Sequence, residues 1–251
     1  MGKIVVLTGA ASGIGRASAT RLAAAGWTVV MLDRAFDTAW RAVDARSFAM
    51  HCDVSEPASV EAAFAAIDTQ LGTIDALVCS AGTLRIGAIV DMSIADFDAL
   101  YHVNTRGAWL VARAAVQLMR KRRDPAALRR IVFVGSISAI RPKVGNGAYG
   151  AQKAALHTLT GVMAAELGGE GILVNAVAPG TVDTPMIQAM QDASQTGRYR
   201  PSGTSPLGRV AQPEDVAAVI EFYLGDQSNY VTGTVIPVDG GTRAAFVPPA
   251  A

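Results

Sequence analysis

The sequence has little cysteine and little histidine. Its two cysteines, Cys52 and Cys79, are too few for a disulfide framework or a Cys-based metal site. Both end apolar segments, so we expect buried, reduced thiols. The three histidines, His51, His102 and His157, share no spacing typical of metal ligands. We therefore predict neither a disulfide scaffold nor a metal site.

The chain also lacks an excess of charge of either sign, and it lacks a long hydrophobic run. Its 22 Lys and Arg residues nearly cancel 21 Asp and Glu residues, which leaves a formal net charge of +1 and no field to attract nucleic acid. The chain contains no stretch of about 18 apolar residues, which is the length needed to cross a bilayer. The apolar run at 4–7 is too short for the core of a signal peptide. We expect no nucleic-acid partner, no membrane span and a cytoplasmic location.

What the chain does have is a regular alternation of two patterns. Hydrophobic residues make up 51% of it and charged residues 17%, enough for one packed domain over residues 1–251. Short β-branched runs alternate with longer helical patterns, which is typical of an α/β fold: a doubly wound, Rossmann-type parallel sheet of about seven strands with helices on both faces. The expected strands are Lys3–Thr8, Thr28–Asp33, Ser47–Cys52, Ile74–Cys79, Arg130–Gly135, Leu173–Ala178 and Val235–Val238, and the expected helices are Gly13–Ala25, Val60–Leu71, Asp96–Arg120, Tyr149–Leu167 and Pro213–Leu224.

Three segments carry further local expectations. Ser59 precedes an apolar-periodic run and is expected at a helix start. The polar, weakly periodic stretch at about 186–205 is interpreted as a lid over the substrate. The basic runs within Arg120–Arg130 are interpreted as a solvated helix end.

A glycine-rich turn joins the first expected strand to the first helix. It reads Thr8-Gly9-Ala10-Ala11-Ser12-Gly13-Ile14-Gly15, so its spacing is Gly-x-x-x-Gly-x-Gly. Glycines let the backbone approach a pyrophosphate closely, and the N–H groups and dipole of a helix start favour negative charge. The turn predicts a dinucleotide site, and a ligand-free glycine loop is the alternative if it stands alone.

Two aspartates follow later strands on the cofactor side. Asp33 closes the second strand, where a carboxylate can accept hydrogen bonds from the adenosine ribose and repels a 2′-phosphate. It favours NAD over NADP, although the adjacent Arg34 offers a phosphate a partner. Asp53 is placed either to contact adenine or simply to cap a strand end or helix.

The residues expected to carry the chemistry lie further along the chain. Tyr149 and Lys153 are four apart and share one face of a helix. An adjacent ammonium and the positive charge of NAD⁺ both favour a phenolate, which would make the tyrosine a base near neutrality. Ser136 ends the fifth expected strand, where its hydroxyl can hold a substrate oxygen. Ser138 is a neighbour that can also touch substrate.

Taken together, these motifs resemble the short-chain dehydrogenase/reductase family, in its compact group of about 250 residues. The resemblance spans nearly the whole chain. The motifs that carry it are the Thr8–Gly15 turn, Val103-Asn104-Thr105, Ser136 with Tyr149 and Lys153, Asn175, Pro179-Gly180 with Thr184, and Val238-Asp239-Gly240-Gly241.

The resemblance implies a catalytic tetrad. Tyr149 would be the general acid/base, Ser136 would steady the reacting oxygen, Lys153 would lower the tyrosine pKa and bind the nicotinamide ribose, and Asn104 would support a water relay. The implied cofactor contacts are Gly9, Ser12, Gly13, Ile14, Gly15, Asp33, Asp53, Val54, Ser80, Ala81, Gly82, Tyr149, Lys153, Pro179, Gly180, Val182 and Thr184. One departure is Cys79-Ser80-Ala81-Gly82, where the family has Asn-Asn-Ala-Gly. NADP-using relatives often carry a basic residue where this chain has Ser12.

The function predicted from the sequence is NAD-dependent interconversion of a secondary alcohol and a ketone, with a small-molecule substrate. An NADPH-dependent reductase of 3-oxoacyl thioesters is the alternative, with Arg120–Arg130 as its only candidate carrier-docking patch. A dinucleotide sensor without catalysis is a third hypothesis. The substrate walls are expected from Thr83–Ile89, Ile140–Gly147 and Met186–Ser205. The resemblance also implies a homotetramer.

Overall fold

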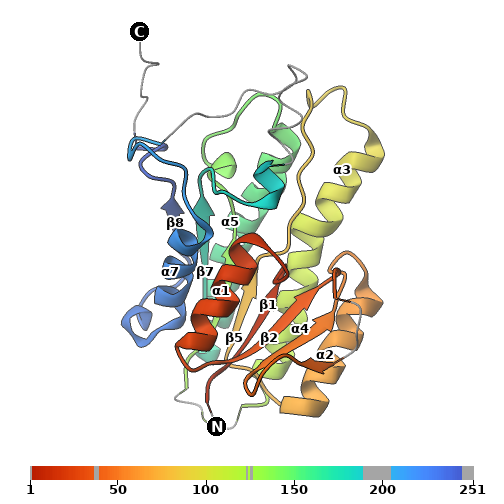
Figure 1. Ribbon diagram of the computed structural model, residues 1–251, viewed down its shortest axis with the longest axis vertical. Helices are drawn as coiled ribbons and strands as arrows, with labels where there is room; N and C mark the ends of the chain where they lie inside the picture. Colours follow the sequence, from red (N-terminus) through yellow and green to blue (C-terminus); the bar gives the residue numbers. More distant parts are fainter. Residues whose placement is uncertain (1, 37–39, 123, 125–126, 189–204, 245–251) are drawn as a thin grey trace.

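A computed structural model describes residues 2–36, 40–122, 124, 127–188 and 205–244. Its strands form one sheet of order β3-β4-β2-β1-β5-β6-β7-β8 (Figure 1). Every pairing is parallel except that of β3 with β4. The strands are β1 (Ile4–Thr8), β2 (Thr28–Asp33), β3 (Arg41–Ala42), β4 (Ser47–His51), β5 (Ala76–Cys79), β6 (Arg129–Val134), β7 (Ile172–Pro179) and β8 (Val235–Val238).

Helices cover both faces of this sheet (Figure 1). They are α1 (Gly13–Ala24), α2 (Pro57–Leu71), α3 (Ile94–Tyr101), α4 (Ala108–Met119), α5 (Gly147–Leu167) and α7 (Pro213–Leu224), with shorter turns η1 (His102–Gly107), η2 (Ile137–Ala139), η3 (Gly168–Glu170) and η4 (Asp226–Ser228). One apolar cluster joins the sheet to α2, α4 and α5, and a second joins it to α1 and α7. β1 and β7 are buried along their whole length because they receive helices on both sides. The predicted fold class, a single doubly wound α/β domain, is confirmed.

The sheet has eight strands where about seven were predicted. The additional strand, β3, is only two residues long, exposed, and antiparallel to β4 at the edge of the sheet. Such a short strand leaves no alternating hydrophobic pattern in the sequence.

The long helix predicted over Asp96–Arg120 is interrupted. The backbone forms α3, then a π-helical segment η1, then α4. A π turn adds a residue without proline or a change in hydropathy, so periodicity alone does not reveal it. The start of α2 also differs, because Pro57 occupies its first turn and Ser59 instead accepts a hydrogen bond from the backbone N–H of Asp53.

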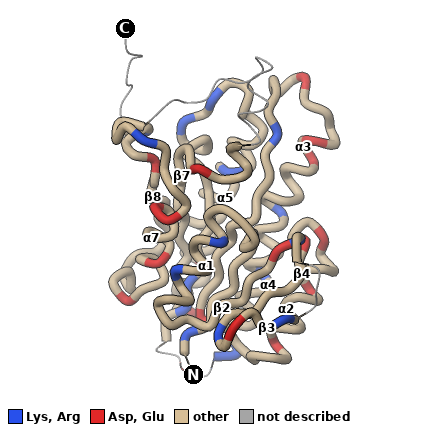
Figure 2. The backbone as a smooth tube through the Cα atoms, viewed as in Figure 1, with Lys and Arg blue, Asp and Glu red and all other residues tan. Residues whose placement is uncertain are grey.

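The basic stretch predicted to be solvated is partly buried. Arg129 and Arg130 are 6% and 4% exposed at the start of β6. They bond backbone carbonyls at Met119 and Leu128, respectively. Over the rest of the molecule, charges of both signs are interspersed (Figure 2). Among the described helices, none has the length and apolar character needed to cross a bilayer.

Candidate active site

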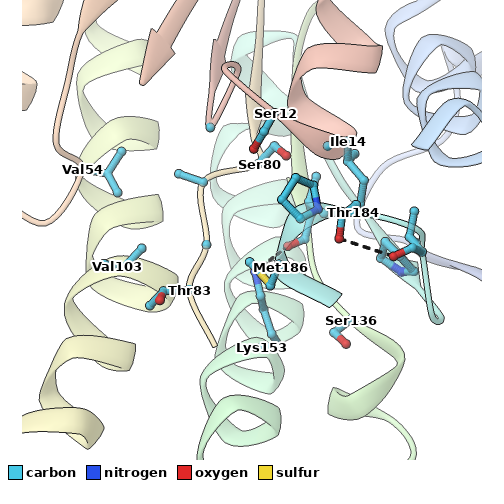
Figure 3. Close-up of a pocket in the computed structure, with 18 of the residues that line it drawn as sticks. Ser12, Ile14, Val54, Ser80, Thr83, Val103, Ser136, Lys153, Thr184 and Met186 are labelled. Carbon is cyan, nitrogen blue, oxygen red and sulfur yellow. Dashed lines mark hydrogen bonds between the residues drawn. The ribbon is translucent and has the colours of Figure 1, made fainter. Parts of the chain in front are cut away.

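One pocket lies along the carboxyl edge of the sheet. There the strand order reverses: β2, β4 and β3 lie on one side of β1, and β5 to β8 lie on the other. In open α/β sheets ligands bind at this position. Figure 3 shows side chains from several elements pointing into the pocket: Ser12 and Ile14 at the start of α1, Ser80 after β5, and Lys153 on α5. Segments far apart in the sequence therefore form one cavity.

The glycine-rich turn lies at one end of this pocket. Gly9 has φ +67°, and a Cβ on it would lie 2.7 Å from the Ala81 backbone. A Cβ on Gly15 would lie 2.1 Å from the carbonyl oxygen of Gly9, so only glycine lets α1 begin this close to β1. The start of α1 presents N–H groups and a positive dipole to the pocket, which suits a pyrophosphate.

Asp33 and Asp53 lie beside that end of the pocket. The Asp33 carboxylate accepts hydrogen bonds from the backbone N–H groups of Ala11, at 3.0 Å, and Ala35, at 2.9 Å. Asp53 accepts from the N–H and hydroxyl of Ser55. Burial raises the pKa of Asp53, but the Ser55 hydrogen bonds outweigh it and hold the pKa below its ordinary value. Both carboxylates line the pocket in fixed orientations.

Ser136, Tyr149 and Lys153 line the other end. Lys153 is 4% exposed and donates a 2.9 Å hydrogen bond from Nζ to the carbonyl of Val134. Its Nζ lies 5.7 Å from the centre of the Tyr149 ring. Burial lowers the pKa of Lys153 to about 8, while the nearby Cys79 opposes the shift.

The pKa of Tyr149 shifts in the direction opposite to that expected for a base. Burial raises it to about 12, and a hydrogen bond with Ser136 only partly offsets this. The expected lowering by the adjacent ammonium does not prevail in the protein without a ligand. An additional positive charge close to the ring would be needed to bring the phenolate into the neutral range.

Asn104 lies behind the pocket wall, within η1, and is fully buried. Its Oδ1 accepts from the N–H of Thr83 and its Nδ2 donates to the carbonyl of Thr83, both at 2.9 Å. The amide side chain therefore pairs with one residue of the pocket wall as a neighbouring strand would. The Asn104 side chain does not itself line the pocket.

The turn after β5 and the turn after β7 close the middle of the pocket. The N–H of Ala81 donates to the Thr8 hydroxyl at 3.3 Å. A Cβ on Gly180 would lie 3.0 Å from the Cα of Asp239, so the Pro179-Gly180 turn packs directly on the turn after β8. Thr184 is held by a weak 3.4 Å bond to the carbonyl of Val182.

Most residues predicted for the site line this pocket. They are Gly9, Ser12, Gly13, Ile14, Asp33, Asp53, Val54, Ser80, Ala81, Gly82, Ser136, Tyr149, Lys153, Pro179, Gly180, Val182 and Thr184. Gly15 and Asn104 are the two that lie behind the lining. Of the expected substrate walls, Thr83, Met186 and Ile187 line the pocket, while residues 140–147 contribute none of its described lining. The predicted lid at 186–205 falls mostly on 189–204, outside the described residues.

Several lining residues were not predicted. Cys52, Val103, Val134, Gly135 and Pro185 all belong to the lining, and each lies within two residues of a residue named from the motifs. Their closeness to a motif residue is therefore the sequence signal that could have predicted them. Both cysteines are free and buried, as expected. In the described part of the chain, no group of three or more His, Cys, Asp or Glu side chains could hold a metal ion.

Comparison with known proteins agrees with this geometry. A family model described as Enoyl-(Acyl carrier protein) reductase matches residues 9–243. The 3-oxoacyl-[acyl-carrier-protein] reductase FabG of Thermotoga maritima is 37% identical over 247 residues, covering 96% of this chain and 97% of the relative. Meso-2,3-butanediol dehydrogenase of Serratia marcescens is 34% identical over 247 residues, covering 97% and 95%.

A solved structure shows the same likeness in three dimensions. The 3-ketoacyl-(acyl-carrier-protein) reductase from Brucella melitensis, complexed with NADH, aligns with a TM-score of 0.85 at 28% identity and covers 96% of this chain and 98% of its own. The chain therefore belongs to the short-chain dehydrogenase/reductase family of oxidoreductases, which use NAD(P) cofactors, and to its compact group of about 250 residues.

Proposed function

We propose that this protein is an NAD-dependent dehydrogenase/reductase that interconverts a secondary alcohol and a ketone. The observation that carries the proposal is one pocket with two chemically different ends. The N-terminus of α1 and Asp33 lie at one end, and Ser136, Tyr149 and Lys153 lie at the other. A dinucleotide laid between them would bring its nicotinamide to the hydroxyl-bearing residues.

Each residue of the chemical end has a proposed task. NAD, when bound, supplies the hydride acceptor, and its reduced form the donor. Ser136 orients the substrate oxygen, and Tyr149 takes the hydroxyl proton in oxidation or gives it back in reduction. Because burial raises the pKa of Tyr149 to about 12, the phenol holds its proton until positive charge gathers beside it. The positive charge of bound NAD⁺ would supply what the adjacent ammonium alone does not, and Lys153 binds the nicotinamide ribose. Asn104 supports the proton path by holding the Thr83 wall.

The preference for NAD over NADP rests on Asp33. Its two carboxylate oxygens are fixed by backbone N–H groups and lie in the pocket, so they can accept hydrogen bonds from ribose hydroxyls. The 2′-phosphate of NADP would be repelled by this carboxylate, because the two hydrogen bonds hold its negative charge in place. Arg34 also lines the pocket and is the group that could oppose this preference.

Isothermal calorimetry with NAD⁺ and NADP⁺ tests the cofactor assignment. We expect the wild type to bind NAD⁺ at least about tenfold more tightly, and Asp33→Ala to reduce that ratio roughly tenfold. Asp98→Ala removes an exposed carboxylate on α3 and should leave the ratio unchanged. Tighter binding of NADP⁺ by the wild type would refute the assignment. Binding without turnover of any secondary alcohol or ketone would favour a dinucleotide sensor.

The alternative, NADPH-dependent reduction of a 3-oxoacyl thioester, is favoured by the name of the Thermotoga maritima relative. The only docking patch that we predicted for a carrier protein does not support it. Arg129 and Arg130 are buried at the start of β6, at the edge of the sheet opposite the pocket. Arg120 pairs with Glu170 instead of standing free. Faster reduction of a 3-oxoacyl thioester by NADPH than of simple ketones by NADH would reverse this order.

We further propose a homotetramer that acts in the cytoplasm. Trp109 on α4 and Val162 on α5 are 43% and 48% exposed, which supports an assembly that covers these helices. The two free cysteines agree with a reducing compartment. Light scattering coupled to size-exclusion chromatography should give four times the 26.0 kDa subunit mass.

A further inference from the structure

A hydroxyl-to-amide contact joins the π-helical segment to α5. The Thr105 Oγ1 lies 2.7 Å from Gln152 Oε1 and 3.1 Å from the Gln152 carbonyl oxygen. Both partners are acceptors, so the single hydroxyl proton of Thr105 goes to one of them, and the shorter distance favours the side chain. Gln152 is 7% exposed. The contact is therefore enclosed, where a hydrogen bond is sensitive to the loss of either partner.

The two residues of this contact are each next to a member of the proposed tetrad. Thr105 follows Asn104, and Gln152 precedes Lys153. Successive side chains on an α-helix point about 100° apart. Gln152 thus contacts η1 while Lys153 reaches into the pocket.

Asn104 and Lys153 converge on a single glycine of the pocket wall. A Cβ on Gly82 would lie 3.2 Å from Asn104 Oδ1 and 3.5 Å from Lys153 Nζ. Asn104 is anchored to the backbone of Thr83, and Lys153 to the carbonyl of Val134. Asn104 and Lys153 themselves belong to different elements, η1 and α5. The separation of the amide and the ammonium therefore depends on how η1 packs against α5.

We propose that Thr105 and Gln152 are positioning residues, whose hydrogen bond sets the placement of Asn104 relative to Lys153 and so the proton path from Tyr149. A π turn lacks the regular bond pattern of the α-helices on either side of it, so its position needs a fixed point outside itself. The Thr105–Gln152 bond supplies that point. This inference rests on the proposed function for its kinetic consequence, but not for the geometric one.

Thr105→Val is the direct test, because it keeps the shape of the side chain and removes the hydroxyl. We expect kcat for alcohol oxidation to fall roughly tenfold, with the KM for alcohol within about twofold and the pH profile of kcat displaced. Thr105→Ser keeps the donor and should recover kcat to within about twofold of wild type. Gln152→Met removes the side-chain acceptor of the same hydrogen bond, and we expect the same loss of kcat. It replaces Thr105→Val as the test if Thr105→Val does not fold.

Thr160→Val is the matched control. Thr160 is a fully buried threonine of α5 whose hydroxyl donates to the carbonyl of Leu156 at 2.7 Å, away from the pocket. It should lower stability without moving the pH profile. If Thr105 had only a structural role, Thr105→Val would behave like Thr160→Val, with lower stability and an unchanged pH profile. Wild-type kcat and a wild-type pH profile in Thr105→Val would therefore overturn the proposal.

A second readout needs no turnover. Competitive labelling of lysines with acetic anhydride, followed by mass spectrometry over a range of pH, reports the environment of Lys153 in the protein alone. We expect its labelling rate to change at least about threefold in Thr105→Val and not in Thr160→Val. If no alcohol or ketone is turned over, the proposed function fails, yet this labelling still decides whether the bond positions Lys153. Unchanged labelling in both variants would refute it.

Discussion

The two edges of the sheet bury charged side chains in different ways. At the amino edge, Asp75 is 5% exposed, accepts a 2.7 Å hydrogen bond from the N–H of Ile4, and forms an ion pair with Arg122. Arg130 lies beside it with bonds to Asn229 and to the exposed carboxylate of Asp226. At the carboxyl edge, Lys153 is equally buried, but among the described residues no carboxylate forms an ion pair with it.

This difference separates stability from function. At the amino edge, Asp75 and Arg130 are buried charges with opposite partners, and the removal of a partner leaves an uncompensated group. A buried ammonium held only by a carbonyl is costly to keep, and its pKa falls because the charged form is poorly solvated. Groups of this kind are typical of functional sites, where a ligand completes their environment. The following predictions test this contrast, from the largest expected effect to the smallest.

Tyr149→Phe should have the largest effect, on activity alone. Removing the phenol takes away the proposed acid/base, so kcat/KM for alcohol oxidation should fall about 10³-fold. Binding of NAD⁺, measured by calorimetry, should stay within about threefold. Tyr230→Phe, at a fully exposed tyrosine, is the control and should match wild type. Activity above about a tenth of wild type in Tyr149→Phe would remove Tyr149 from the mechanism.

Asp75→Ala should act on stability alone. It leaves the N–H of Ile4 and the guanidinium of Arg122 without their acceptor, so urea denaturation should show a loss of about 3 kcal/mol in the free energy of unfolding. Activity per folded molecule should stay at the wild-type level, because the pocket lies at the other edge. Asp68→Ala breaks the more exposed pair with Lys121 and should cost less than about 1 kcal/mol. Equal losses in the two variants would contradict the contrast between buried and exposed pairs.

Lys153→Met should lower activity by less than Tyr149→Phe does, and yet stabilise the fold slightly, by about 1–2 kcal/mol near pH 7. The pKa of Lys153 is about 8 in the folded protein against 10.5 for an unperturbed lysine. Between those values the unfolded chain binds more protons, so the wild type gains stability as pH rises through this window. The cost of burying the charged Lys153 ammonium is fully present below pH 8.

Urea denaturation at several pH values checks this sign. Above pH 9, the raised pKa values of Cys52 and Tyr149 act in the opposite direction, because the folded protein then keeps protons that the unfolded chain loses. The difference in free energy of unfolding between wild type and Lys153→Met isolates the lysine. That difference should shrink as pH rises from 7 to 10. A constant difference would mean that the ammonium is not strained by its burial.

Much of the architecture could be predicted because local patterns determine it. The parallel strands show as β-branched runs, and the glycine turn before α1 is dictated by contacts that allow no Cβ at Gly15. The pocket residues after β2, β5 and β7 could be predicted because carboxyl ends of parallel strands share one edge.

The features that could not be predicted depend on packing at long range. The π turn is compatible with the same sequence pattern as an α-helix, and the hydrogen bonds between Asn104 and Thr83 that accompany it join residues 21 apart. Arg129 looks like a surface residue because charged side chains usually lie there, but inside the fold its two terminal nitrogens donate to carbonyls at the end of α4 and in η3. The raised pKa of Tyr149 reflects burial, which no spacing encodes.

The contact between Gly180 and Asp239 has a consequence for the order in which the protein is made on the ribosome. β8 is synthesised after every other strand, and until it emerges, residues Ala176–Pro179 of β7 form an edge without their strand partner. The same strand brings Asp239 against the Pro179-Gly180 turn of the pocket. A nascent chain therefore gains protection from edge-to-edge association and a complete pocket wall in one late step. Chains stalled before residue 235 should accordingly associate through this open edge and lack the packing of Asp239 on the Pro179-Gly180 turn.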